Sequence, residues 1–317
     1  MSFIPHFSVH QVFIAPWTTD ISSYGWIMLM TFLVGAACGL VGNYLILRRM
    51  ALMGDAISHS VLPGIVVAFL VTGSRGTVPM FAGAVAAAVL TTVLIEVIHR
   101  HSVIKQDAAI GIAFSSLFAL GVILIAVFAD TVDLDQDCVL NGELPLIAVS
   151  PPMTLAGMTL GPPAVVRMGC VLFFSCGLIL LFYKELLLSS FDPALASAMG
   201  LRSGWIHQLL MIWLSITVVS AFEAVGSILV IAMLILPGAT AALISDRLVV
   251  RLGWSLVHAA LSAVLGLHLS IGLDCSPSGA AVVAGSFLFG VAWVFGPQDG
   301  LVSRWWSRKE GRTETLV

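Results

Sequence analysis

Charged side chains are scarce in this sequence. They account for 10% of its 317 residues, whereas hydrophobic residues account for 59%, and a soluble globular chain carries about 25% charged residues. The scarcity of charge therefore excludes a soluble globular protein. The composition is typical of a protein that crosses a membrane several times.

Cysteine is also rare, because the chain has five cysteines and no C-x-x-C spacing. This absence excludes a zinc knuckle and a disulfide-stapled fold. Three of the cysteines lie in apolar runs, where a cysteine is usually a small buried apolar residue. Cys138 and Cys275 lie in expected outer loops, so in an oxidising compartment a disulfide and two free thiols are both open.

Several catalytic motifs are missing as well. None of the three lysines follows a glycine, so the phosphate-binding pattern G-x-x-x-x-G-K does not occur. The chain therefore does not hydrolyse ATP, and any ATP-driven work needs a partner. The absence of His-Glu-x-x-His and of paired aspartates in the apolar runs excludes an intramembrane metalloprotease. We expect a chain that is not an enzyme, has no catalytic residue and binds no resident cofactor.

Long apolar runs, in contrast, are abundant. A helix needs about 20 residues to cross a bilayer, and we count nine runs near this length, while strand-length alternating segments are absent. The predicted fold is all-α, a polytopic membrane protein with eight to nine transmembrane helices in one domain over residues 1–317. The nine runs are Gly25–Leu47, Ala56–Thr72, Val78–Ile98, Ala108–Ala129, Val165–Tyr183, His207–Phe222, Val225–Ile244, Leu252–Leu273 and Gly279–Phe295.

The few cations are placed unevenly between these runs. Cytoplasmic loops are enriched in Lys and Arg, and an outer N-terminus places twelve of the 14 cations inside and two, Arg75 and Arg167, outside. We therefore predict an extracytoplasmic segment 1–24, an outer acidic and proline-rich loop 130–163, and a cytoplasmic tail 299–317. Segment 1–24 has no Lys or Arg, so we expect no removable signal peptide. Because the cations follow this topology, they form no basic surface for nucleic acid.

The stretch 186–205 falls on the cytoplasmic side and is too polar to span the membrane. Asp192 before Pro193 has the form of an N-cap followed by a first-turn proline, and Gly200 is placed as a C-terminal stop. We predict a short helix on the cytoplasmic face. From the sequence pattern alone, a simple interfacial connector is the other interpretation.

Asp55 and His59 stand near the start of the second run. Four residues apart, they share one helix face with Ser58 beside them, and ionisable groups at membrane depth usually face a polar path. A carboxylate and an imidazole suit Mn, Fe or Zn as half of a metal site, while Pro63 and Gly64 are expected to bend or break the helix after the pair. The other interpretation is an Asp–His hydrogen bond that holds two helices together.

Three runs of residues resemble, in order and separation, the marks of the permease family of zinc, manganese and iron ABC importers. The resemblance extends over residues 27–295, nearly the whole chain. It departs at Gly238, where many relatives have alanine. The runs are Asp55-x-x-Ser58-His59-x-x-Leu62-Pro63-Gly64, Phe191-Asp192-Pro193-x-x-Ala196-x-x-x-Gly200-Leu201 and Val225-Gly226-x-x-Leu229-Val230-x-Ala232-x-Leu234-Ile235-Leu236-Pro237.

This resemblance implies a type II ABC importer-like permease in the bacterial inner membrane that moves Mn, Zn or Fe into the cytoplasm. The implied partners are a cytoplasmic ATP-binding subunit, an extracytoplasmic solute-binding protein, membrane lipid, and a second permease copy or a sister permease. Asp55 and His59 would line the ion path, with helix breaks at Pro63, Gly64, Pro237 and Gly238. A coupling helix to the ATP-binding subunit would be formed by Phe191, Asp192, Pro193, Ala196, Gly200 and Leu201.

Two other transport functions are open at this point. An ion-coupled secondary transporter would use Asp55 and His59 as a proton relay, but it would need no coupling helix. A siderophore or cobalamin permease would share the fold, although the Asp55/His59 pair favours a bare ion over a bulky chelate. Mn, Fe and Zn accept the same ligands, so the sequence does not select one of them.

The cation distribution generates a topology prediction. In a variant without native cysteines, an impermeant thiol reagent added outside should label Ser22→Cys and leave Ser307→Cys unlabelled, since the reverse orientation would place twelve cations outside. Labelling of position 307 from outside intact cells would contradict the predicted orientation.

Overall fold

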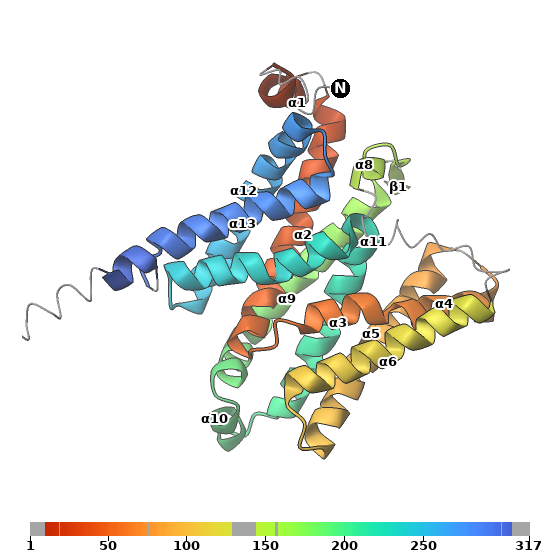
Figure 1. The fold of residues 1–317 in the computed structure, drawn as a ribbon, viewed down its shortest axis with the longest axis vertical. Helices are drawn as coiled ribbons and strands as arrows, with labels where there is room; N and C mark the ends of the chain where they lie inside the picture. The colour runs from red at the N-terminus through yellow and green to blue at the C-terminus, as the bar shows by residue number, and fades with distance from the viewer. Residues whose placement is uncertain are drawn as a thin grey trace, which may run out of the picture. The chain divides into compact units, whose positions relative to one another are not determined.

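The computed structural model describes residues 10–18, 20–74, 76–128, 144–155, 158–298 and 300–305. Helices dominate this part of the chain (Figure 1), and the predicted all-α fold is confirmed. The helices are η1 (His10–Ile14), α1 (Ala15–Thr18), α2 (Ile21–Leu47), α3 (Met53–Ser60), α4 (Leu62–Thr72), α5 (Thr77–His101), α6 (Gln106–Val127), α8 (Leu144–Ile147), α9 (Pro163–Phe191), α10 (Pro193–Ala198), α11 (Ser203–Ile244), α12 (Leu248–Leu273) and α13 (Pro277–Phe295).

A small hairpin lies in the stretch expected to be the outer loop 130–163. Strands β1 (Met153–Leu155) and β2 (Met158–Gly161) pair in antiparallel fashion. Gly161 has φ +100°, and a Cβ at this position would overlap the Trp26 ring, so only glycine fits here. Residues 130–143, with Cys138 among them, lie outside the described residues, so the acidic outer loop and a Cys138–Cys275 disulfide stay predictions.

In the described part of the chain, eight segments are long and apolar enough to cross a membrane, with α3 and α4 together forming one of them. One of the eight, α11, has 42 residues and would be about 63 Å long if straight, about twice the hydrocarbon thickness. It is interrupted at Gly226, which has φ 79° and ψ 169°. The two apolar runs predicted for this region therefore lie on α11, and the interruption separates them.

The predicted break at Pro237 and Gly238 is wrong, because α11 continues through both residues to Ile244. A proline in a helix removes one backbone hydrogen bond, yet the helix is continuous here. Gly238 lies against Asn43, with its missing Cβ 3.4 Å from the Asn43 backbone nitrogen. The interruption of α11 lies instead at Gly226, which has a positive φ. Glycine adopts a positive φ easily, whereas other residues are strained by it.

The break expected at Pro63 and Gly64 occurs slightly earlier. Helix α3 ends at Ser60 and α4 begins at Leu62, so Pro63 stands in the first turn of α4. Backbone N–H groups in a first turn have no acceptor within the helix, so proline costs no hydrogen bond there. Gly64 serves packing, because a Cβ there would overlap the carbonyl oxygen of Gly83 on α5.

The cytoplasmic stretch predicted at 186–205 is shorter in the structure. Helix α9 continues through Phe182, where φ is −113° and ψ is 24°, and ends at Phe191. Helix α11 already begins at Ser203. The apolar residues after Tyr183 extend α9, so the surface segment is α10 with its short connections.

Two compact units make up the chain. Unit 1 comprises Met1–Ile46, Leu144–Gly169 and Ala232–Val317. Within it, glycines of α2 permit close contact: a Cβ at Gly35 would lie 2.9 Å from the Ala259 Cβ, and one at Gly42 would overlap the Leu234 carbonyl oxygen. Asn43 adds a hydrogen bond of 2.8 Å to the Ser255 hydroxyl. Small residues and buried polar contacts of this kind hold helices together in lipid.

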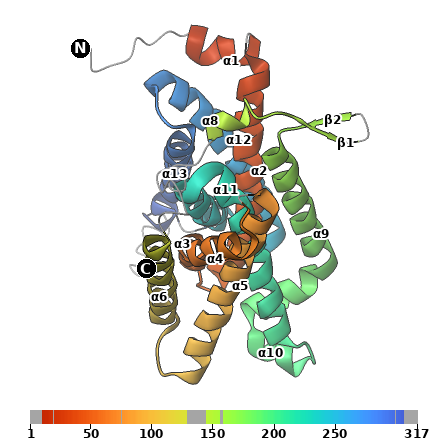
Figure 2. The ribbon, with the colours of Figure 1, turned by 90° about the vertical axis from the view of Figure 1, so that its right-hand side faces the viewer.

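Unit 2 comprises Leu47–Glu143 and Cys170–Ile231. Helices α3 and α4 pack against both α5 and α6 (Figures 1 and 2). Gly64 and Gly83 face each other, and the Thr91 hydroxyl donates to the Ser60 hydroxyl at 2.7 Å. This packing fixes α3, the helix that carries Asp55 and His59.

Close packing of α2 generates a stability prediction. Gly42→Ala should lower the unfolding temperature of the detergent-purified protein, because the new methyl group overlaps the Leu234 carbonyl and overpacking costs about 1–3 kcal/mol. The matched control is Gly253→Ala in α12, where a Cβ has nothing within 4 Å. Equal unfolding temperatures for the two variants would disprove the close contact.

Candidate functional site

Asp55 and His59 form a pair on one face of α3. His59 Nε2 lies 3.4 Å from Asp55 Oδ1, and the two side chains are 29% and 44% exposed respectively. Asp55 is in the first turn of α3, where the helix dipole favours negative charge. The shared face predicted from their spacing is confirmed.

Aromatic rings of α6 border one side of this pair. The His59 ring centroid is 5.6 Å from that of Phe114 and 6.1 Å from that of Phe118. Ser58, expected beside the pair, is buried and donates its hydroxyl hydrogen to the Gly54 carbonyl at 2.9 Å. The Ser58 hydroxyl therefore points to the backbone of its own helix. The pair consists of the Asp55 and His59 side chains, with the rings of Phe114 and Phe118 beside His59.

The separation of the two side chains is compatible with two ligands of one ion and equally with a direct Asp–His contact. Ligand atoms about 2.1 Å from a tetrahedral ion are about 3.4 Å apart, which equals the separation of His59 Nε2 and Asp55 Oδ1. In the described residues, no group of three or more His, Cys, Asp or Glu side chains is positioned to hold a metal ion. Among the described residues, Asp55 and His59 therefore form a set of two donors.

Helix α10 is defined at its N-terminal end as the sequence predicts. The Asp192 side chain accepts hydrogen bonds from the backbone N–H groups of Ala194 at 3.0 Å and Leu195 at 2.9 Å. Pro193 is the first helical residue. Both features of the predicted N-cap are confirmed, and they hold the first turn of α10 in place.

The C-terminal end of α10 closes with a Schellman motif. Gly200 has φ +84°, the Leu201 N–H donates to the Ala196 carbonyl at 3.0 Å, and the Gly200 N–H donates to the Ser197 carbonyl at 3.1 Å. These are the two bonds of that motif. The predicted glycine stop is confirmed.

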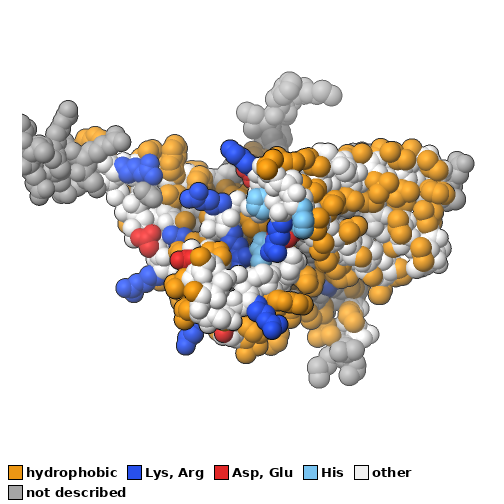
Figure 3. Space-filling view, turned by 90° about the horizontal axis from the view of Figure 1, so that it is seen from below, with side chains coloured by type: hydrophobic (Ala, Val, Ile, Leu, Met, Phe, Trp, Pro, Cys, Tyr) orange, Lys and Arg blue, Asp and Glu red, His pale blue; other side chains and the backbone are white. Residues whose placement is uncertain are grey.

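Apolar side chains project from this short segment. Phe191, Leu195 and Met199 are exposed and recur every four residues, while Ala196 is buried. In Figure 3, seen from the end at which α10 lies, Lys, Arg and His side chains gather and hydrophobic side chains flank them. Exposed apolar groups within a polar surface are typical of a protein contact.

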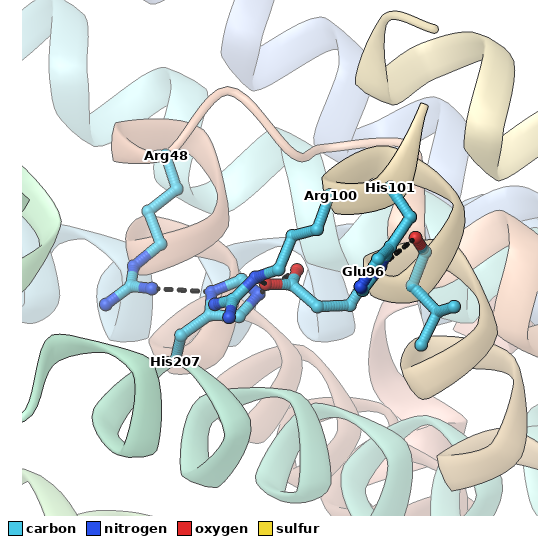
Figure 4. A network of polar contacts seen from close by, with 6 residues as sticks. Arg48, Glu96, Arg100, His101 and His207 are labelled. Carbon is cyan, nitrogen blue, oxygen red and sulfur yellow. Dashed lines mark hydrogen bonds and ion pairs between the residues drawn. The ribbon is translucent and has the colours of Figure 1, made fainter. Parts of the chain in front are cut away.

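A polar network near α10 was not predicted from the sequence. Arg48 donates from Nε to the Ser190 hydroxyl at 3.1 Å, from Nη2 to the Ser189 hydroxyl at 2.9 Å, and from Nη1 to His207 Nδ1 at 2.8 Å. Figure 4 shows Arg48, His207, Glu96 and Arg100 meeting in one place. Burial lowers the pKa of the Arg48 guanidinium, and the charge of Glu96 opposes this shift.

The signal for this network was present but ambiguous. Glu96 and Arg100 are four residues apart near the end of α5 and form an ion pair, a spacing that is readable in a sequence. The contacts of Arg48 with Ser189 and His207 join residues more than 140 positions apart. No local pattern indicates contacts of that range.

The chain is similar to membrane proteins of several transport systems. The profile of a family described as the ABC 3 transport family matches residues 22–296. The manganese transport system membrane protein MntD of Bacillus subtilis is 43% identical over 279 residues, which are 88% of this chain and 94% of that protein. The zinc transport system membrane protein TroD of Treponema pallidum is 40% identical over 281 residues, 88% of this chain and 75% of that protein.

A solved structure is similar over the same extent. PsaBC from Streptococcus pneumoniae in complex with Fab matches with a TM-score of 0.75 at 32% identity, covering 95% of this chain and 100% of that chain. The likeness therefore extends to nearly the whole fold.

The cap of α10 generates a prediction of local stability. Asp192→Ala removes the acceptor of two backbone N–H groups and should cost about 1 kcal/mol, a roughly fivefold loss of amide protection. Hydrogen exchange of the Ala194 and Leu195 amides measures it. Asp192→Asn, which keeps an acceptor oxygen, is the control. Unchanged exchange in the alanine variant would show that the cap does not stabilise α10.

Proposed function

The chain belongs to the ABC 3 transport family, and from this premise we propose that it is the membrane permease subunit of an ATP-binding cassette importer for a divalent transition metal. The observation that carries this proposal is the Asp55/His59 pair, held 3.4 Å apart on a helix of an apolar bundle. A carboxylate and an imidazole in such a place are costly, and ionisable residues that are kept there usually mark the path of a substrate or ion.

Manganese and zinc are the proposed cargo. The similar membrane proteins MntD and TroD are named for manganese and zinc transport respectively. Oxygen and nitrogen ligands suit both ions. Iron, which the sequence also allows, stays a prediction.

The open donor set supports a role for a second permease subunit. Two ligands from one chain bind an ion weakly, whereas an equivalent pair from a second copy or a sister permease raises the number to four. A path between two subunits would hold an ion long enough for selection. It would release the ion when the two pairs separate.

Helix α10 is the proposed contact with the ATP-binding subunit. Its two ends are closed by the Asp192 cap and the Gly200 turn, and Leu195 of the helix and Met199 just after it are exposed. A short, rigid, partly apolar projection fits a groove in a partner protein. The extracytoplasmic solute-binding protein would deliver the ion from the opposite side, with the N-terminus outside and the C-terminus inside.

The alternative transport functions are less well supported. An ion-coupled secondary transporter would need no helix such as α10 for contact with an ATP-binding subunit. A permease for a chelated metal has no use for two metal-ligating side chains in its path. Both alternatives leave one of the two main features of unit 2 without a function.

The proposed function is tested by removing the pair. In liposomes that contain the whole transport complex, Asp55→Ala and His59→Ala should each lower manganese or zinc uptake at least about tenfold, because one ligand cannot replace two. Purification with the ATP-binding subunit should be unchanged. Asp107→Ala, an exposed carboxylate in the first turn of α6, is the control.

The same assay also identifies the cargo. Manganese, zinc and iron are supplied together, and the accumulated ions are measured in each variant. Wild-type uptake by the Asp55→Ala/His59→Ala double variant would remove the pair from the ion path.

A further inference from the structure

A single arginine joins the segment that leads into α3 to the segments that flank α10. Arg48 follows α2 directly, and Asp55 comes seven residues later. The Arg48 guanidinium donates hydrogen bonds to Ser189 and Ser190 in the last turn of α9, and to His207 in the first turns of α11. All of these residues belong to unit 2. Arg48 therefore contacts the chain on both sides of α10.

The hydrogen bonds in this network have only one possible direction. An arginine N–H is always a donor, so His207 Nδ1 must be the acceptor of the bond from Arg48. The neutral ring then carries its proton on Nε2, which donates to Glu96 Oε2 at 3.1 Å. Glu96 also binds Arg100. The result is a directed chain from Arg48 through His207 to Glu96 on α5 (Figure 4).

Burial makes this arrangement sensitive to displacement. The side chains of His207 and Glu96 are 15% and 16% exposed, and the network borders a cavity of about 560 Å³ together with Pro193, the first residue of α10. A largely buried charge is costly to leave without its partners. The segments joined by Arg48 consequently move together or break several bonds at once.

The connection from Arg48 to α3 is short and constrained. Arg49 has a left-handed backbone with φ +58°, a conformation that strains a non-glycine residue. Met50 and Met53 are buried, and the Met53 N–H donates to the Met50 carbonyl at 3.1 Å. Because these residues leave the connection little conformational freedom, a shift of Arg48 also moves the start of α3.

We propose that Arg48 and His207 are positioning residues that transmit displacement of α10 to the Asp55/His59 pair. This inference rests on the proposed function, in which α10 meets the ATP-binding subunit and the pair meets the ion. When the partner pushes α10, the ends of α9 and α11 move, and Arg48 carries that movement into α3. Packed cores tend to switch between discrete arrangements, so a small shift of Arg48 would alter the Asp55/His59 pair.

The test separates transmission from docking and from ion binding. In the liposome system, Arg48→Gln should leave purification with the ATP-binding subunit and basal ATP hydrolysis unchanged, while ions transported per ATP hydrolysed fall roughly tenfold. His207→Leu, whose side chain has neither a hydrogen-bond acceptor nor a donor, should give the same results as Arg48→Gln. His207→Gln, which offers an acceptor to Arg48 and a donor to Glu96, should restore most of the ratio.

The control is His99→Leu at the border of the same cavity. The Nδ1 atom of His99 contacts the Ile104 carbonyl in the connection between α5 and α6, outside the Arg48–His207–Glu96 chain. A normal transport ratio in Arg48→Gln, or equal failure of His207→Gln and His207→Leu, would overturn the proposal. Loss of binding to the ATP-binding subunit in Arg48→Gln would overturn it too, since the network would then serve docking. Absence of metal uptake by the wild-type complex would instead reject the proposed function.

Discussion

The cost of placing charge in hydrocarbon is the constraint on which the rest of this structure depends. Apolar side chains cover the long helices, and the charged groups of unit 2 described above have partners. Asp55 has His59 on the same helix face, and Glu96 has both Arg100 and His207. Each ionisable group that remains within the apolar region is therefore informative, because a neutral residue would be cheaper at the same position.

Local features were predictable from the sequence because their causes are local. The apolar runs predict the spans, the four-residue spacing of Asp55 and His59 predicts their shared face, and the Asp192 cap and Gly200 turn predict both ends of α10. The sequence placed the break near Pro237, which proved to lie inside α11. A proline within an apolar run therefore does not by itself mark the end of a helix.

Features that depend on distant segments were not predictable. The contact of Arg48 with His207 joins positions that are 159 residues apart, and the place of Gly42 against Leu234 depends on the packing of two helices. Ser58 illustrates the same limit, because its hydroxyl turns to the Gly54 carbonyl rather than to the neighbouring pair. Which way a small polar side chain points is decided by the few acceptors within its reach, and helix spacing does not specify that choice.

The two closed ends of α10 have a consequence for the kinetics of assembly. The Asp192 side chain and the Gly200 turn order this helix within the chain itself, so its conformational entropy is lost during folding rather than during association. A partner that binds through α10, as proposed, would meet a preformed shape and would spend little of its binding energy on ordering the helix. Diffusion and orientation, rather than refolding of α10, would then set the rate of that association.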